Sequence, residues 1–349
     1  MSDNRPIITA YCLSWHVTSS GSMHDLLINP LTPYADIQQV AWDGKEELPP
    51  QKDGELVIFY MLPPTEAWLA ECVTPIVWIP MVDALYYPPN MAHHPMVRVV
   101  AFSNVIVHVA GELGLPVLQL RYYCDPAQFP VASFDGERVM LYWNRTGFFH
   151  RGFLLKLCHE LGVNRLLFRN ALDPNIQQSK FYALPDKIGA MVIETHPTLT
   201  SYDDYLALLH RANIFIAPRG VEGVGVALLE AMASGCCVIG YDNTTMNEYI
   251  LHNQNGFLVY IYRRNRIFIR LYALYERFFT QVYAPYIQRR TGREVHPPKL
   301  TMLQDWRQLR KLDIAKLGAQ ARQSSLDGYT QWIDSIPHYA EFVLKGILP

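Results

Sequence analysis

The sequence is short of charge, and its charges nearly balance. Charged residues make up 18% of the 349 residues, and 30 basic against 32 acidic side chains leave a net charge of -2. Such a chain has no basic field that would favour nucleic acid as a partner. Half of the residues are hydrophobic, so the low charge does not indicate disorder. The composition is typical of an ordinary α/β protein with a large core.

Paired cysteines and long apolar segments are also missing. The six cysteines show no CxxC spacing, so we expect reduced, buried thiols rather than a disulfide framework. No apolar run reaches the ~20 residues of a membrane span. The first residues show no charged leader ahead of an apolar segment of signal length. We therefore expect a cytoplasmic protein, and attachment to the inner face of a membrane stays open.

Short apolar runs bounded by turn residues recur along the chain. Near-continuous hydrophobicity, rather than alternation, is typical of strands buried on both faces of a parallel sheet. Stretches with helical periodicity lie between them, at 146–162 and at 201–212, where Ser201 can cap the helix. This alternation predicts doubly wound α/β sheets with right-handed crossovers. The expected strands are 6–13, 55–60, 75–80, 97–102, 104–110, 138–143, 190–195, 213–218 and 236–241.

A segment without periodicity divides the chain. Residues 124–137 contain two prolines and a glycine, which suits a hinge. We expect an N-terminal domain at 1–130, a C-terminal domain at 131–300 and closing helices at 301–349. Ligands of open α/β sheets bind at the carboxyl ends of the strands, so a cleft between two such sheets is the expected site.

Residues 259–290 interleave arginines with aromatic residues and predict a long helix. Either this helix packs on its own domain, with its arginine stems along apolar surface, or one face touches anionic lipid or a lipid-linked acceptor. The sequence leaves both interpretations open.

The loop RGVEGVG follows an expected strand and precedes an expected helix at 226–235. Gly223 and Gly225 let backbone N–H groups approach a ligand closely, and the helix N-terminus adds partial positive charge, which suits phosphate. Glu222 precedes the helix, and Glu230 lies about a turn inside it. Carboxylates accept hydrogen bonds from hydroxyls, so the layout suits a ligand with hydroxyls on both sides of a diphosphate. Alternatively, Glu230 only favours the first helical turn and Glu222 is a solvated acid.

The wider stretch resembles the signature of retaining GT-B glycosyltransferases of family four. There a strand ends in proline, seven residues separate the glutamates of E-G-x-G and E-A-M-A-x-G, and a later glutamate precedes NG-x-LV. Those elements fall here on Pro218, Glu222, Gly223, Gly225, 230–233, Gly235, Glu248 and 255–259. The resemblance implies a GT-B fold, with two facing Rossmann-like domains and the active site in the cleft between them.

The resemblance also implies roles on the donor side, which lies on the C-terminal domain. Glu222 would hold the hydroxyls of the donor sugar, and Glu230 those of the ribose. The diphosphate would lie on the backbone N–H groups of Gly223, Val224, Gly225 and Val226. The loop after the next strand stands where the family often has paired glycines, and its members facing sugar or phosphate would be Asn243, Thr244 and Thr245.

The stretch RVMLYWNRTGFFHRG is similar to a family strand followed by Gly-Arg and then Lys-Gly. By this similarity Arg145 and Arg151 would neutralise the diphosphate and support its departure, with Asn144 in place of the usual glycine. The alternative for both arginines is solvated charge at a helix end. Since these cations can do the work of Mg²⁺, we expect no metal and no cofactor besides the nucleotide-sugar co-substrate.

The N-terminal half matches the family more loosely. Gly21 takes the place of a glycine-rich loop near the donor phosphate. Asp83 takes the place of the aspartate in a His-Asp pair that reaches the reaction centre, and the histidine is missing. The acceptor would lie mainly on this domain.

The sequence therefore predicts a metal-independent, retaining glycosyltransferase of the hexosyltransferase type. It would move a sugar from a nucleoside diphosphate sugar to a glycan or lipid-linked acceptor. Two alternatives stay open: a sugar-nucleotide epimerase of the same fold, and a non-catalytic GT-B module that binds a glycan or scaffolds a partner.

Overall fold

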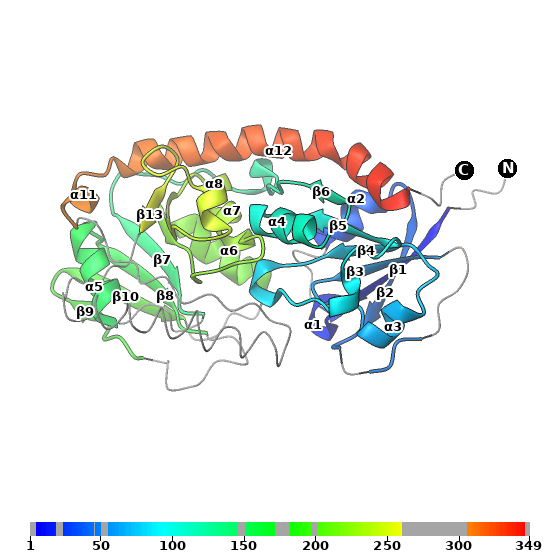
Figure 1. The fold of residues 1–349 in the computed structure, drawn as a ribbon. Helices are drawn as coiled ribbons and strands as arrows, with labels where there is room; N and C mark the ends of the chain where they lie inside the picture. Colours follow the sequence, from blue (N-terminus) through cyan, green and yellow to red (C-terminus); the bar gives the residue numbers. More distant parts are fainter. Residues whose placement is uncertain are drawn as a thin grey trace. The chain divides into compact units, whose positions relative to one another are not determined.

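The computed structural model describes residues 5–18, 24–44, 46–49, 55–145, 151–171, 182–196, 201–259 and 306–345. They form two compact units (Figure 1). Unit 1 holds the described residues up to Tyr122 together with 330–345. Unit 2 holds those from Tyr123 to Val259 together with 306–329.

Unit 1 is built on a parallel sheet in the order β2-β1-β3-β4-β5-β6. Its strands are β1 (Ile7–Cys12), β2 (Asp36–Ala41), β3 (Leu56–Tyr60), β4 (Ile76–Ile79), β5 (Val97–Ala101) and β6 (Val117–Gln119). Strands β3 and β4 are buried along their whole length, as expected for strands covered on both faces. The core contains a stack of Tyr11 on Phe59, with 5.2 Å between the ring centroids.

Short helices and turns connect the strands of unit 1. They are α1 (Ser14–Thr18), a π-helical turn (His24–Ile28), α2 (Asn29–Leu31), α3 (Glu66–Ala70), 3₁₀ turns at Val82–Ala84 and Pro89–Met91, and α4 (Asn104–Glu112).

Unit 2 has a second sheet, in the order β13-β12-β11-β7-β8-β10-β9, which is parallel except for the edge pair β9–β10. Its strands are β7 (Val139–Trp143), β8 (Arg165–Arg169), β9 (Lys187–Ile188), β10 (Met191–His196), β11 (Ile214–Ile216), β12 (Cys237–Tyr241) and β13 (Phe257–Val259). Its helical elements are a 3₁₀ turn (Pro126–Gln128), α5 (Arg151–Glu160), α6 (Tyr202–Arg211), α7 (Val226–Ala233), α8 (Met246–Tyr249) and α11 (Trp306–Arg310). Helix α12 (Ile314–Leu344) contributes residues to both units.

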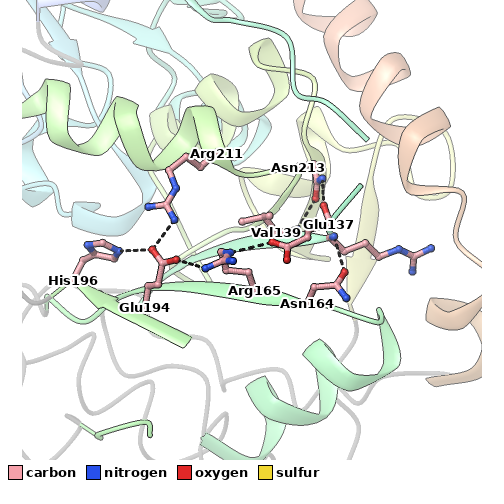
Figure 2. A network of polar contacts seen from close by, with 9 residues as sticks. Glu137, Val139, Asn164, Arg165, Glu194, His196, Arg211 and Asn213 are labelled. Atoms are coloured by element: carbon pink, nitrogen blue, oxygen red, sulfur yellow. Dashed lines mark hydrogen bonds and ion pairs between the residues drawn. The ribbon is translucent and has the colours of Figure 1, made fainter. Parts of the chain in front are cut away.

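A polar network links the starts of β7, β8 and β11 with β10 in unit 2 (Figure 2). The Asn213 side chain precedes β11; its Oδ1 accepts from the Val139 N–H at 2.9 Å, and its Nδ2 donates to the Glu137 carbonyl at 2.9 Å. Glu194 on β10 accepts from Arg165 at 2.5 Å and from Arg211 at 2.6 Å. Partial burial alone would raise the pKa of Glu194, but these two guanidinium groups lower it. The network therefore joins four strands of the unit 2 sheet through side chains.

One expected strand is wrong. Residues 104–110 lie in helix α4, whose N-cap Ser103 accepts a hydrogen bond from the Ile106 N–H at 3.3 Å. A short apolar run does not distinguish a buried strand from a buried helix, and a serine just before the run is a helix-start signal. The other eight expected strands are confirmed, with ends that shift by one or two residues.

The expected helix starts and stops are confirmed where the structure describes them. Ser201 and Asp204 form a reciprocal capping box at the start of α6, and Gly235 ends α7 in the left-handed conformation with φ 74°. All six cysteines are free, and five are buried. No helix in the described ranges has the length and apolar character to cross a membrane. Of the helix expected at 259–290, Val259 instead ends strand β13, and the rest lies outside the described residues.

Candidate functional site

The strand order of unit 2 reverses between β7 and β11. Strands that follow β7 in the chain, β8 and β10, lie on one side of it, while β11, β12 and β13 lie on the other. Open α/β sheets bind ligands at the carboxyl ends of the strands beside such a reversal. Here those ends carry Arg145 after β7, the loop 217–225 after β11 and the loop 242–245 after β12.

The loop after β11 leads into helix α7 through a left-handed residue. Gly225 has φ 77° and ψ 47°, and Val226 is the first helical residue. A Cβ on Gly225 would lie 3.7 Å from the Glu222 Cβ, so the conformation rather than the space requires glycine. Gly223 and Val224 are buried beside it. The Leu228 and Leu229 N–H groups donate to the Gly225 carbonyl at 2.9 and 3.1 Å, so the helix begins directly after this loop. A helix N-terminus in this position suits an anion, and the anion site stays a prediction.

Glu222 and Glu230 are both buried, with 7% and 5% of their surfaces exposed. Arg219 Nη1 lies 3.7 Å from Glu222 Oε2. The Tyr202 hydroxyl donates to Glu230 Oε1 at 2.6 Å. Buried carboxylates need such cations and donors to offset the loss of hydration. The structure therefore excludes the alternative in which Glu222 is a solvated loop acid.

The loop after β12 is hydrogen-bonded to the loop after β11. The fully buried Thr245 hydroxyl donates to the Glu222 carbonyl at 3.2 Å, and Asn243 Nδ2 donates to the Gly220 carbonyl at 3.2 Å. Asn243 Oδ1 also accepts from the Thr244 N–H at 3.0 Å. These bonds hold the Glu222 loop in place, and contacts of the three side chains with sugar or phosphate stay a prediction.

Arginine and aromatic side chains gather at the carboxyl ends of β7 and β8. The Arg145 guanidinium lies 4.8 Å from the Trp143 ring centroid, and that of Arg169 lies 3.5 Å from the same ring. Arg169 also lies 5.9 Å from the ring centroid of Tyr205 on α6. Such cation–π contacts hold guanidinium groups in place. Positive charge is therefore concentrated beside the strand-order reversal.

Asn144 occupies the position between Trp143 and Arg145 and is fully buried. Its N–H donates to the Arg169 carbonyl at 2.7 Å, and its Nδ2 donates to Asn170 Oδ1 at 2.8 Å. Its Oδ1 has no hydrogen-bond partner within the described ranges. The side chain thus joins the ends of β7 and β8.

The remaining expected residues are Arg151, Asp83 and Gly21. Arg151 is the exposed first residue of α5. Asp83 belongs to unit 1, in the exposed 3₁₀ turn that follows β4. Gly21 lies outside the described residues. No cluster of three or more His, Cys, Asp or Glu side chains suited to a metal occurs among the described residues.

This chain is similar to known glycosyltransferases in part of its sequence and in its fold. Residues 188–268 match the family model of glycosyl transferases group 1. Among solved structures, a sucrose-phosphate synthase from Thermosynechococcus elongatus is 12% identical with a TM-score of 0.57, over 97% of this chain and 98% of that one. The fold is that of the GT-B glycosyltransferases. A search of curated protein sequences gives no significant match.

Two further GT-B structures match over nearly full length. HepE from Anabaena, solved with UDP and glucose, is 11% identical with a TM-score of 0.52, over 96% of this chain and 100% of that one. The lipopolysaccharide outer core galactosyltransferase WaaB is 13% identical with a TM-score of 0.52, over 97% of this chain and 99% of that one. The matched segment and the GT-B fold together support a glycosyltransferase.

The matched segment contains Glu222 and Glu230. The same edge of the sheet also carries residues that the sequence did not single out. Arg219 stands three residues before Glu222, a spacing that could have indicated their ion pair. Tyr202 lies in α6 and Glu230 in α7, with strand β11 between them in the sequence. No short sequence motif therefore contains both residues. Trp143 and Arg169 end neighbouring strands in register, which becomes visible only once the strand order is known.

Proposed function

We propose that this chain is a metal-independent, retaining glycosyltransferase that transfers a hexose from a nucleoside diphosphate sugar to a glycan or lipid-linked acceptor. The observation that carries the proposal is the pair of buried carboxylates, Glu222 and Glu230, around the glycine-started helix α7 at the strand-order reversal. An anion site with hydrogen-bond acceptors on either side suits a sugar, a diphosphate and a ribose in series.

The donor would lie on unit 2. Glu222 accepts hydrogen bonds from the sugar hydroxyls, and Glu230 accepts them from the ribose. Arg145 and Arg151 face the diphosphate, together with the backbone N–H groups of residues 223–226. The nucleotide sugar is the only co-substrate, and no cofactor is required.

In the proposed reaction the acceptor hydroxyl oxygen attacks the anomeric carbon from the side of the leaving group. The bond between that carbon and the phosphate oxygen breaks, and its electron pair stays with the diphosphate. The acceptor proton passes to a phosphate oxygen. The protein contributes positioning and stabilisation of the developing charge, and Asp83 lies on the acceptor side.

A thermal-shift panel with UDP, GDP, ADP and TDP and their glucose and galactose derivatives tests the donor site. We expect one nucleotide to raise the melting temperature and one of its sugars to raise it further. Glu230→Gln removes the nucleotide shift, whereas Glu222→Gln keeps it and removes the additional shift from the sugar. If none of these ligands stabilises the chain, the donor site is wrong.

Product analysis with the stabilising nucleotide sugar then tests the reaction. We expect release of the nucleoside diphosphate and a product with the anomeric configuration of the donor, measured by NMR. Conversion of the nucleotide sugar without any acceptor would instead identify an epimerase. Tight binding without nucleotide release, across a panel of glycan and lipid-linked acceptors, would identify a binding module.

A further inference from the structure

The hydrogen bond between Tyr202 and Glu230 joins the helix before β11 in the sequence to the helix after it. Tyr202 is the first residue of α6, which precedes β11, and Glu230 lies in α7, which follows it. The O–H···O distance is 2.6 Å, within the range of charge-assisted bonds to carboxylates. Glu230 is 5% exposed, whereas Tyr202 is 52% exposed. The partly exposed Tyr202 thus donates a hydrogen bond to the buried Glu230 carboxylate.

The backbone under Tyr202 is fixed. The Ser201 hydroxyl accepts from the Asp204 N–H at 3.2 Å, and the Asp204 carboxylate accepts from the Ser201 N–H at 3.0 Å. This capping box sets the first turn of α6. The Tyr202 ring lies 6.0 Å from the ring of Tyr205, one turn further along the helix. The Tyr202 hydroxyl therefore comes from a rigid support.

The covalent geometry of a glutamate side chain does not fix the plane of its carboxylate. Its terminal torsion is broad and roughly two-fold, so rotation about this bond redirects the lone pairs that ligand hydroxyls would use. A fixed donor on Oε1 sets the plane of the carboxylate, and an ionised carboxylate can accept about four hydrogen bonds. The bond from Tyr202 occupies one of these acceptor positions.

The neighbouring Tyr205 remains a neutral phenol. Burial and the nearby charge of Glu230 raise the pKa of Tyr205 well above its usual value. The Glu230 carboxylate thus lies beside a buried phenol that keeps its proton.

We propose that Tyr202 is a positioning residue that orients the Glu230 carboxylate for the ribose hydroxyls of the donor nucleotide. The inference rests on the proposed function, in which Glu230 accepts from the ribose. Tyr202 would determine how strongly the protein distinguishes a ribonucleotide from its deoxyribonucleotide.

The test compares affinities for a ribonucleotide and its 2′-deoxy form in the full-length protein and in Tyr202→Phe. The probes are UDP, GDP and ADP with their 2′-deoxy counterparts, measured by titration calorimetry. In the unchanged protein we expect the ribonucleotide to bind at least about tenfold more tightly, as for a hydrogen bond to a charged group. In Tyr202→Phe, which keeps the ring, we expect this ratio to fall about fivefold or more.

Tyr34→Phe is the matched control, because Tyr34 is a partly exposed tyrosine of unit 1, and its ratio should equal that of the unchanged protein. If the unchanged protein prefers the ribonucleotide and Tyr202→Phe keeps the same affinity ratio, Tyr202 has only a structural role, whatever the melting temperature. The inference about Tyr202 then fails, while the proposed ribose role of Glu230 stands. If the unchanged protein shows no preference for ribose, or binds none of the probes, the ribose role of Glu230 fails and takes the inference with it.

Discussion

At the scale of single residues, His16 is a titratable group buried at the carboxyl edge of unit 1. The strand order of this sheet reverses between β1 and β3, and His16 follows β1 while Met61 follows β3. His16 Nε2 lies 2.9 Å from Met61 Sδ, and its ring stacks on Trp15 with 3.5 Å between centroids. Only 4% of His16 is exposed, and burial lowers its pKa to about 4.

We expect this histidine to make the chain less stable in mild acid. The unfolded chain takes up the proton near pH 6.5, but the folded chain takes it up only near pH 4. The contribution of neutral His16 to the free energy of unfolding is therefore complete above pH 6.5, and it is lost as the pH falls towards about 4. The slope from this one proton is at most ~1.4 kcal/mol per pH unit. Urea unfolding between these pH values measures it.

The control is His16→Gln, which cannot take up this proton. Carboxylates that titrate in the same range contribute equally to both proteins, so the difference between the two slopes isolates His16. Equal slopes for the two proteins would show that folding does not lower the pKa of His16.

At the scale of elements, α12 packs against unit 2 through a glycine. A Cβ on Gly318 would overlap the Gly235 carbonyl oxygen and come within 2.6 Å of the Phe134 ring. We therefore expect Gly318→Ala to destabilise the protein by about 1–3 kcal/mol, the usual range for overpacking, although alanine is the better helix former. The melting temperature and urea unfolding measure the change.

Gly111 in α4 provides the opposite case for comparison. A Cβ there would meet nothing within 4 Å, so Gly111→Ala should stabilise the chain by about 0.4–1 kcal/mol through helix propensity and the unfolded state. A stabilising effect of both substitutions would mean that α12 does not pack this closely.

The elements also show what the sequence alone can and cannot predict. Strands such as β3 and β12 are buried on both faces, so their uninterrupted apolar runs identified them. Edge strand β2 alternates between half-buried and exposed residues, and no apolar run marks it. The run at 104–110 satisfied the strand criterion, but Ser103 caps it as a helix. An apolar run indicates that a segment is buried, whereas a capping residue such as Ser103 indicates that the segment is a helix rather than a strand.

The same division holds for the site. Glu222, Gly225 and Glu230 follow one another along the chain around a single helix start, so their spacing showed them. Tyr202 belongs to a preceding helix and Arg169 to another strand, and only the folded sheet brings them to the same edge. A sequence reveals the part of a site that one loop carries. Residues contributed by other elements require the strand order.

At the scale of the whole molecule, fold similarity extends much further than sequence similarity. Solved GT-B structures match nearly the full length at 11–13% identity, while the family model covers only residues 188–268. Parallel strands need only apolar residues of suitable size, which many sequences supply. In the proposed function the segment with the two glutamates binds phosphate and hydroxyls, and such a site restricts residue types closely. The proposal thus accounts for a family match in this segment.

The balance of charge over the whole chain leads to a prediction about metal. The net charge is only -2, yet Arg145, Arg169 and the start of α7 concentrate positive charge at the carboxyl edge of unit 2. These groups can stabilise a leaving diphosphate in place of Mg²⁺. We therefore expect transfer from the stabilising nucleotide sugar to proceed at an unchanged rate in EDTA, measured by nucleotide release.

Removing one of these cations should matter more than removing metal. We expect Arg145→Ala to lower kcat by about 10²–10³-fold, as for loss of one group that stabilises transition-state charge, whereas Arg145→Lys keeps the charge and loses less. A transferase known to need Mg²⁺, assayed in the same buffer, shows that the chelator acts. Loss of turnover in EDTA that Mg²⁺ or Mn²⁺ restores would show that the arginines need a metal beside them, because a chelator cannot remove protein charge.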